Sequence, residues 1–238
     1  MQNVEVLRQI LLITDGCSNE GADPVQVALL AARQGVGVSV IGVLDEGVLG
    51  LGGEQEIIRI AEAGQGMYRL TRVSDLSRTV QIMTQRALEL SVERSVLSGW
   101  GAHDTLTLDN LPPALRPQLA REMENAAEIA LLDICLVIDL SGSMNPKRRY
   151  VQEAVRDLVD TLSTRKGNYQ LEAVVFPDPQ GGIVKHLLVH DAKLADAIGR
   201  IEPQGNTPTG PALALALQIL RTRAEAAKRA KGRRHDAG

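Results

Sequence analysis

Two strongly apolar segments of this chain each run straight into oxygen-bearing side chains. Ile-Cys-Leu-Val-Ile leads directly into Asp139-x-Ser141-x-Ser143. Near the start of the chain, Ile-Leu-Leu-Ile leads through a threonine into Asp15. Uninterrupted apolar runs of this kind are typical of strands buried on both faces of a parallel sheet. Ligands of such sheets bind at the carboxyl ends of the strands, so both polar runs are candidates for a common site.

A third polar segment, Gly-Asn-Thr-Pro-Thr-Gly, lies far downstream and contains Thr207 and Thr209. Carboxylate and hydroxyl oxygens are hard ligands that suit Mg²⁺ or Mn²⁺. The sequence has no cluster of His and Cys near these segments that would favour zinc. The three segments together therefore predict a magnesium-type site.

The remainder of the chain alternates between strand and helix patterns. A turn at 178–181 joins two of the later strands as a hairpin, which predicts one antiparallel pair at an edge of the sheet. Residues 91–132 interrupt the alternation with Gly and Pro and contain one helix pattern at 114–131. The predicted strands are 8–14, 38–43, 67–70, 133–140, 170–176 and 182–189, and the other predicted helices are 24–33, 54–63, 75–90, 147–163, 193–201 and 211–228.

The three polar segments resemble the metal-ion-dependent adhesion site (MIDAS) of von Willebrand factor A (vWA) domains. In that family the Asp-x-Ser-x-Ser strand comes first and the Thr-Asp-Gly strand comes late, whereas here the order is reversed. The chain therefore resembles a circularly permuted vWA domain. The resemblance implies one domain over 1–238, in which 133–238 form the N-terminal half of the fold, 1–90 the C-terminal half, and 91–132 a linker.

The resemblance also implies the architecture. We expect an α/β, doubly wound, Rossmann-like fold with helices on both faces of a mostly parallel six-stranded sheet and one antiparallel edge strand. For the metal, it implies direct binding by the hydroxyls of Ser141, Ser143 and Thr207. Asp139 and Asp15 would bind directly or through water. Thr207 is chosen over Thr209 because it follows the Gly-x that matches the family's loop.

In the family, a Glu or Asp side chain of a partner protein fills the open position of the metal. The resemblance therefore implies a Mg²⁺-dependent protein-binding module rather than an enzyme. It would be part of a prokaryotic intracellular assembly, with a partner such as a MoxR-type AAA+ ATPase.

Two other functions are compatible with the same residues. A Mg²⁺-dependent phosphohydrolase could use Asp139 as its nucleophile, but haloacid-dehalogenase-like enzymes need a second Asp two residues later, where this chain has Ser141. The chain also lacks a Gly-x-x-x-x-Gly-Lys-Ser/Thr phosphate loop. A structural scaffold without metal is the remaining alternative. Loss of ligands is the usual reason for loss of metal, and all five ligand positions are filled here.

Charge and cysteine content limit the location and the partners. The formal net charge of −3 argues against a general affinity for nucleic acid. The segment 221–238 is basic, with seven Lys or Arg against two Asp or Glu, and is interpreted as a solvated helix end. The chain has no pattern typical of a signal peptide or a membrane span. Cys17 and Cys135 are expected at different heights of the sheet and thus as free thiols, which suits a cytoplasmic protein.

The sequence is compatible with both a monomer and a domain-swapped dimer. A linker of this length permits the two halves to close within one chain. They could equally pair between two chains as a domain-swapped dimer.

Overall fold

A single sheet forms the centre of the molecule. The computed structural model describes residues 6–44, 51–99 and 112–235. Its six-stranded sheet has the order β3-β2-β1-β4-β5-β6, so β1, the first strand of the chain, lies in the middle. The strands are β1 (Val6–Thr14), β2 (Val36–Leu44), β3 (Gln65–Arg72), β4 (Leu131–Asp139), β5 (Tyr169–Phe176) and β6 (Lys185–Leu187).

Strand pairing joins segments from opposite ends of the chain. β1 pairs in parallel with β2 on one side and with β4 on the other, and its pairing with β4 extends from Val6 opposite Leu131 to Ile13 opposite Ile138. β5 and β6 form an antiparallel pair at one edge, whereas the other pairs are parallel. The predicted α/β class, with a mostly parallel sheet and one antiparallel edge strand, is confirmed.

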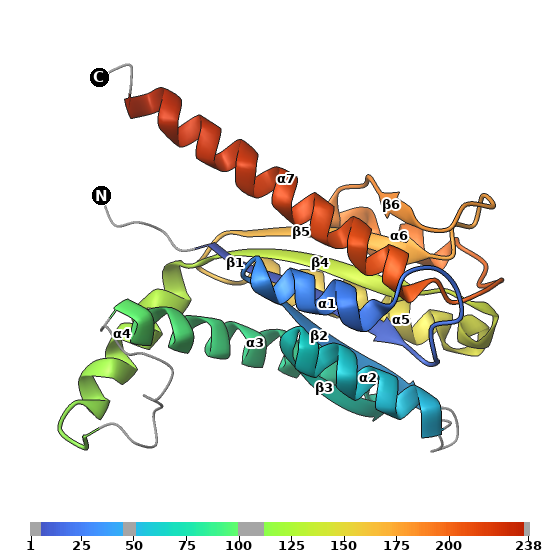
Figure 1. Ribbon diagram of the computed structural model, residues 1–238, viewed down its shortest axis with the longest axis horizontal. Helices are drawn as coiled ribbons and strands as arrows, with labels where there is room; N and C mark the ends of the chain where they lie inside the picture. Colours follow the sequence, from blue (N-terminus) through green and yellow to red (C-terminus); the bar gives the residue numbers. More distant parts are fainter. Residues whose placement is uncertain (1–5, 45–50, 100–111, 236–238) are drawn as a thin grey trace.

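Helices cover both faces of the sheet, as expected for a doubly wound fold (Figure 1). Helices α1, α2 and α7 pack on one face, and α3, α5 and α6 pack on the other. Helix α4 packs against α3. The helices are α1 (Pro24–Arg33), α2 (Leu51–Ala63), α3 (Leu76–Gly99), α4 (Arg116–Ile129), α5 (Arg148–Ser163), α6 (Leu194–Gly199) and α7 (Thr209–His235), with short 3₁₀ helices η1 (Val73–Asp75), η3 (Gly142–Lys147) and η4 (Asp191–Lys193).

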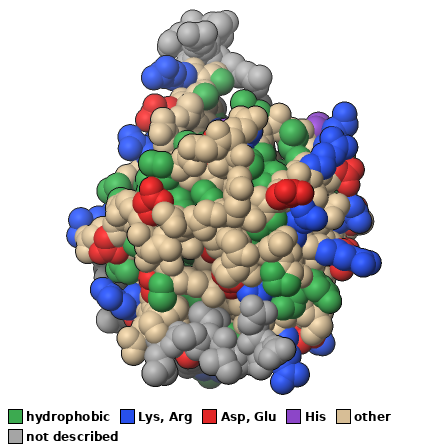
Figure 2. All heavy atoms as spheres, turned by 90° about the vertical axis from the view of Figure 1, so that its right-hand side faces the viewer, with side chains coloured by type: hydrophobic (Ala, Val, Ile, Leu, Met, Phe, Trp, Pro, Cys, Tyr) green, Lys and Arg blue, Asp and Glu red, His purple; other side chains and the backbone are tan. Residues whose placement is uncertain are grey.

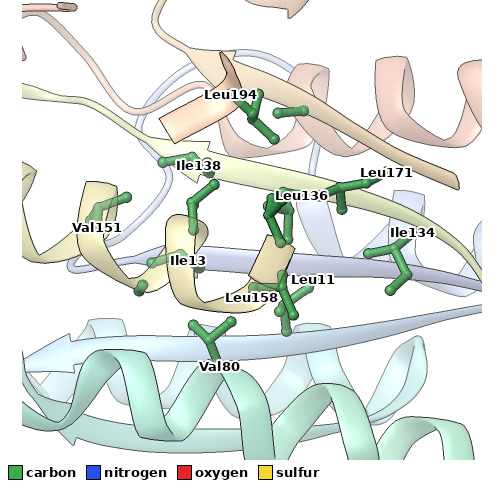
Figure 3. Packing of buried hydrophobic residues seen from close by; sticks show 14 of the residues in the cluster. Leu11, Ile13, Val80, Ile134, Leu136, Ile138, Val151, Leu158, Leu171 and Leu194 are labelled. Carbon is green, nitrogen blue, oxygen red and sulfur yellow. The ribbon is translucent and has the colours of Figure 1, made fainter. Parts of the chain in front are cut away.

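The central strands are apolar on both sides because both sides are covered. Successive strand residues point to opposite faces, so Ile10 and Leu12 of β1 belong to the core beneath α1, α2 and α7. Leu11 and Ile13 belong to the core beneath α3 and α5 (Figure 3). Each buried side chain of this size stabilises the fold by about 1.5–3 kcal/mol, which explains why the strand pattern is a continuous apolar run.

Several elements differ in length from the prediction. Helix α3 continues to Gly99 rather than ending at 90, because Val92 is buried against the same core. The interval 91–132, predicted as a linker, therefore begins inside α3 and ends inside β4. Strand β6 has three residues instead of the predicted eight. Trp100, the only Trp of the chain, lies outside the described residues.

Both cysteines are free thiols, as predicted. Cys17 is exposed after β1, and Cys135 is buried within β4. Among the described helices, none combines the length and apolarity that a membrane span needs.

The start of α7 lies against the loop that follows β1. A Cβ added to Gly210 would lie 1.8 Å from the backbone oxygen of Ala22, so one of the two segments would have to move. We expect Gly210→Ala to lower the free energy of unfolding by about 1–3 kcal/mol. Gly37→Ala is the matched control, since nothing lies within 4 Å of its added Cβ. Urea unfolding of both variants checks this, and equal stability would contradict the contact between loop and helix.

Candidate metal site

The Thr-Asp-Gly run and the Asp-x-Ser-x-Ser run meet at one edge of the sheet. They follow β1 and β4, which are neighbouring parallel strands, so their carboxyl ends coincide. The Thr14 hydroxyl donates a hydrogen bond of 2.6 Å to Oδ2 of Asp139, although the two residues are 125 positions apart. Asp139 is fully buried. The two predicted halves of the site are therefore in direct contact.

The turn after β4 aligns three further oxygen atoms. The backbone N–H of Ser141 donates to Oδ1 of Asp139 over 2.8 Å, which holds the turn against the carboxylate. The hydroxyl oxygens of Ser141 and Ser143 lie 3.2 Å apart. The Ser143 hydroxyl in turn donates to Oδ1 of Asp15 over 2.8 Å. Four of the five predicted ligands thus form one continuous cluster.

The spacing of these oxygens suits a small divalent ion. Adjacent ligands of an octahedral Mg²⁺ with bonds of about 2.1 Å lie about 3 Å apart. The separations from Ser141 to Ser143 and from Ser143 to Asp15 are close to that value. Within the part of the chain that the structure describes, no group of three or more His, Cys, Asp or Glu residues is placed to hold a metal. Any metal here would therefore rely on hydroxyl oxygens and two carboxylates.

Thr207, the fifth predicted ligand, is held by the loop that follows β1. Its backbone N–H donates to the side-chain oxygen of Asn19 over 2.8 Å, and the N–H of Asn19 donates to its carbonyl over 3.2 Å. Among the described residues, no hydrogen bond links the Thr207 hydroxyl to the other four side chains. Thr209 is buried, and its hydroxyl has no hydrogen-bond partner among the described groups. The structure therefore brings the Thr207 loop to this edge without closing it onto the cluster.

Lys147 is a member of the site that the sequence did not predict. Its Nζ forms an ion pair with Oδ2 of Asp15 and donates to the backbone carbonyl of Ser143 over 3.3 Å. The side chains of Lys147 and Asp15 are each only 2% exposed. The sequence signal was misleading because Lys147 begins a Lys-Arg-Arg run at a helix start, which is typical of a solvated surface. Its burial depends on Asp15, which belongs to the other half of the chain.

Comparison with known proteins shows the family of this chain. Residues 134–234 match the model of the von Willebrand factor type A domain. The uncharacterized protein YabS of Bacillus subtilis (strain 168) is 32% identical over 216 residues, which cover 87% of this chain and 86% of YabS. This chain belongs to the YabS family of vWA-domain proteins.

A solved structure extends the family likeness to the fold. The crystal structure of an uncharacterized protein from Alicyclobacillus acidocaldarius subsp. acidocaldarius DSM 446 has a TM-score of 0.84 at 34% identity. The match covers 93% of this chain and 97% of that chain. The whole arrangement of sheet and helices is therefore shared, including the segment before residue 134 that the vWA model does not match.

Burial dominates the electrostatics of the cluster in this vWA domain. It raises the pKa of Asp139 from 3.8 to about 6, against the opposing effect of the hydrogen bonds from Thr14 and Ser141. The negative charge of Asp15 adds a smaller increase. An ionised Asp139 is therefore costly in the protein without metal, and a cation beside it would remove that cost.

A polar hollow is lined by the loop after β1 and the start of α2, which lie on the side of the molecule that faces the viewer in Figure 2. It has a volume of about 590 Å³ and lies between the loop after β1 and helix α2. The carboxylate of Glu56 accepts hydrogen bonds from the backbone N–H of Ser18 at 3.0 and 3.1 Å, which ties that loop to α2. Asp23 is the N-cap of α1, and its side chain accepts a hydrogen bond from the N–H of Val25.

Proposed function

We propose that this protein is a Mg²⁺-dependent binding module that recruits a partner protein through a carboxylate. The main support is that Ser141, Ser143 and Asp15, which come from opposite halves of the chain, converge with their oxygens 3.2 and 2.8 Å apart. The hydroxyls of Ser141, Ser143 and Thr207 and the carboxylates of Asp139 and Asp15 would hold the ion. When bound, Mg²⁺ or Mn²⁺ supplies an electrophilic position that a Glu or Asp side chain can fill.

The proposed partner is a protein of an intracellular prokaryotic assembly, such as a MoxR-type AAA+ ATPase. Gly142 and Ser143 are exposed beside the buried carboxylates, so a side chain of a partner protein can reach this edge. The polar hollow, which is lined by the loop after β1 and by residues of α1 and α2, lacks the apolar lining that is typical of small-molecule sites.

We further propose that the domain is circularly permuted. Residues 133–238 would form the first half of the vWA fold and residues 1–90 the second half. The support is that the family model matches only 134–234, while β1 to β3 extend the same sheet from β4 outward. The site would then be a composite of both halves, closed either within one chain or between two.

An enzymatic role is less well supported by the contacts of Asp139. A phosphohydrolase would need this carboxylate free to attack, yet both of its oxygens accept hydrogen bonds and the side chain is buried. We therefore expect no turnover of a generic phosphate ester. A turnover that disappears with Asp139→Ala would favour the enzyme instead.

Thermal unfolding with and without Mg²⁺ or Mn²⁺ tests the metal site. Metal that binds only the folded state raises its stability, by about 2.7 kcal/mol at a concentration of 100 times the Kd. We expect this rise in wild type and its loss in both Ser141→Ala and Asp15→Ala. Ser163→Ala, an exposed serine of α5, is the matched control.

The pattern of losses separates the possible readings. Loss in both variants supports one site built from both halves of the chain. A rise that survives Asp15→Ala but not Ser141→Ala would contradict the composite site. No rise in wild type would favour the metal-free scaffold. The mass in solution then distinguishes a monomer from a domain-swapped dimer.

A further inference from the structure

Three arginines gather in a hollow at one edge of the sheet. This arginine hollow has a volume of about 540 Å³ and lies at the carboxyl end of β3, the edge strand opposite β6 (Figure 1). It is lined by Arg69 and Arg72 of β3 and by Arg78 of α3, and all three side chains are exposed. Several guanidinium groups around one concave surface are typical of sites that bind an oxyanion.

The positive charge of the arginine hollow is not balanced within the described part of the chain. Asp75 is the one acidic residue among its described lining residues, so three positive charges and one negative charge leave +2. None of the three arginines forms an ion pair with a described residue. Arg86, further along α3, differs in this respect because it pairs with Glu89 over 3.1 Å. A ligand with two negative charges would neutralise the hollow.

The arginines are the groups that such a ligand would contact. Thr71 and Thr79 also line the hollow, but they are buried and their hydroxyl oxygens lie 2.9 Å apart in a mutual hydrogen bond. A phosphate monoester has three terminal oxygens and a charge of about −2 at neutral pH. It can therefore accept hydrogen bonds from all three guanidinium groups and closes the charge count. A carboxylate has two oxygens and one charge, so it would leave part of the positive charge unbalanced.

We propose that the arginine hollow binds the phosphate group of a phosphorylated side chain of a partner protein. The position of the hollow favours this source over a free small phosphate. β3, β2 and β1 are parallel neighbours, so the hollow lies at the same edge of the sheet as Asp15, roughly 10 Å away at about 4.8 Å per strand. A protein bound at the candidate metal site would therefore reach the hollow as well. Only this choice of source rests on the proposed function, whereas the phosphate site itself does not.

NMR signals of the backbone amides, recorded in EDTA, test the phosphate site without any contribution from a metal. The probe is a capped five-residue alanine peptide with phosphoserine at its centre. We expect it to shift the signals at the end of β3 and the start of α3. The same peptide with serine should shift none of them, and the peptide with glutamate should bind roughly tenfold more weakly than the phosphopeptide. A phosphopeptide that leaves these signals unchanged, or binds no better than the glutamate peptide, would overturn the inference.

Variants of the arginines test the assigned contacts. The side chains are exposed, so the variants should fold like wild type. We expect Arg72→Gln and Arg78→Gln each to weaken phosphopeptide binding roughly five- to tenfold, and Arg72→Lys to weaken it less, since the charge stays but the paired N–H donors are lost. Arg33→Gln, an exposed arginine of α1, removes the same charge elsewhere and is the matched control. Wild-type affinity in both Arg72→Gln and Arg78→Gln would overturn the inference.

A peptide with two anionic groups tests the source of the phosphate. Glutamate placed three residues before phosphoserine lies roughly 10 Å from it in an extended chain. We expect wild type to bind this peptide roughly tenfold more tightly in Mg²⁺ than in EDTA, because both sites are then occupied by one ligand. The alanine phosphopeptide, which lacks the glutamate, is the control and should show no gain. If Mg²⁺ binds but the two-group peptide gains nothing, the partner-protein source is contradicted.

The outcomes separate this inference from the proposed function. If the alanine phosphopeptide binds in EDTA but thermal unfolding shows no response to Mg²⁺, the metal site fails and the phosphate site stands. If Mg²⁺ stabilises the protein but the phosphopeptide does not bind, only the phosphate site fails.

Discussion

Asp139→Asn should stabilise the metal-free protein while removing its response to Mg²⁺. Burial raises the pKa of Asp139 to about 6, which means that its charge opposes folding at neutral pH. A shift of this size corresponds to about 3 kcal/mol, since one pKa unit is about 1.4 kcal/mol. The amide can still accept the hydrogen bond of the Ser141 N–H, and its NH₂ group can donate to the Thr14 hydroxyl. The variant thus keeps the local contacts and loses the anionic ligand.

The pH dependence of the free energy of unfolding follows from the direction of this pKa shift. A carboxyl whose pKa is higher in the folded protein than in the unfolded chain contributes stability at low pH. That contribution is lost as the pH rises from 3.8 toward about 6. Urea unfolding in EDTA should therefore show that wild type loses stability across this interval, whereas Asp139→Asn loses less. Asp160→Asn, an exposed acid of α5, is the control. An Asn variant that is less stable than wild type at pH 7 would contradict the assignment of the raised pKa to burial.

Arg223→Met should cause the largest loss of stability that we expect away from the metal site. Arg223 of α7 donates to Oδ1 of Asp133 over 2.5 Å and also pairs with Glu172, which connects α7 to β4 and β5. Asp133 is only 2% exposed, and its other oxygen lies 3.7 Å from Arg8. Removing one partner of a buried pair typically costs about 3–5 kcal/mol because the other charge stays buried. We expect a loss of about 3 kcal/mol, at the lower end, since Arg8 remains.

Two controls separate the loss of the ion pair between Arg223 and Asp133 from a general effect of removing a positive charge. One is a variant of a nearby arginine, and the other is a change of pH. Arg221→Met removes a surface arginine that is 56% exposed, with Glu225 3.9 Å away, and should change stability by less than about 1 kcal/mol. Burial raises the pKa of Asp133 while Arg223 lowers it. The pKa should therefore be higher still in Arg223→Met, and the deficit should shrink as the pH falls and Asp133 is protonated. Adding Asp133→Asn should restore part of the loss, and a double variant no more stable than Arg223→Met would contradict the buried-charge explanation.

The sequence predicted the elements whose side chains follow a regular apolar pattern. The apolar runs that end at Thr14 and Asp139 indicated buried strands because helices cover both faces of the sheet. The position of the candidate site followed from the same strands, since parallel neighbours end at one edge. The resemblance to vWA domains then indicated which residues after those strands belong together.

The sequence could not predict charges whose partners are distant in the chain. Lys147 and Arg223 each belong to a basic run that normally indicates solvent. Lys147 is buried against Asp15 and Arg223 is half-buried against Asp133, and these carboxylates are 132 and 90 positions away. The prediction that 221–238 is a solvated helix end is therefore wrong at Arg223. Thr14 was likewise predicted only as a strand residue, because its hydrogen bond to Asp139 exists only after the two strands pair.

The central position of β1 has a consequence for biosynthesis. The ribosome makes β1 before β4, the strand that completes its pairing, and β4 ends 125 residues after Thr14. At about 5–20 residues per second, that interval lasts roughly 6–25 s. During it, one edge of β1, whose residues 10–13 are all apolar, is unpaired, and such an edge readily pairs with other chains. Until β4 emerges, this edge is available to other chains, so rapid overexpression should favour aggregation over folding.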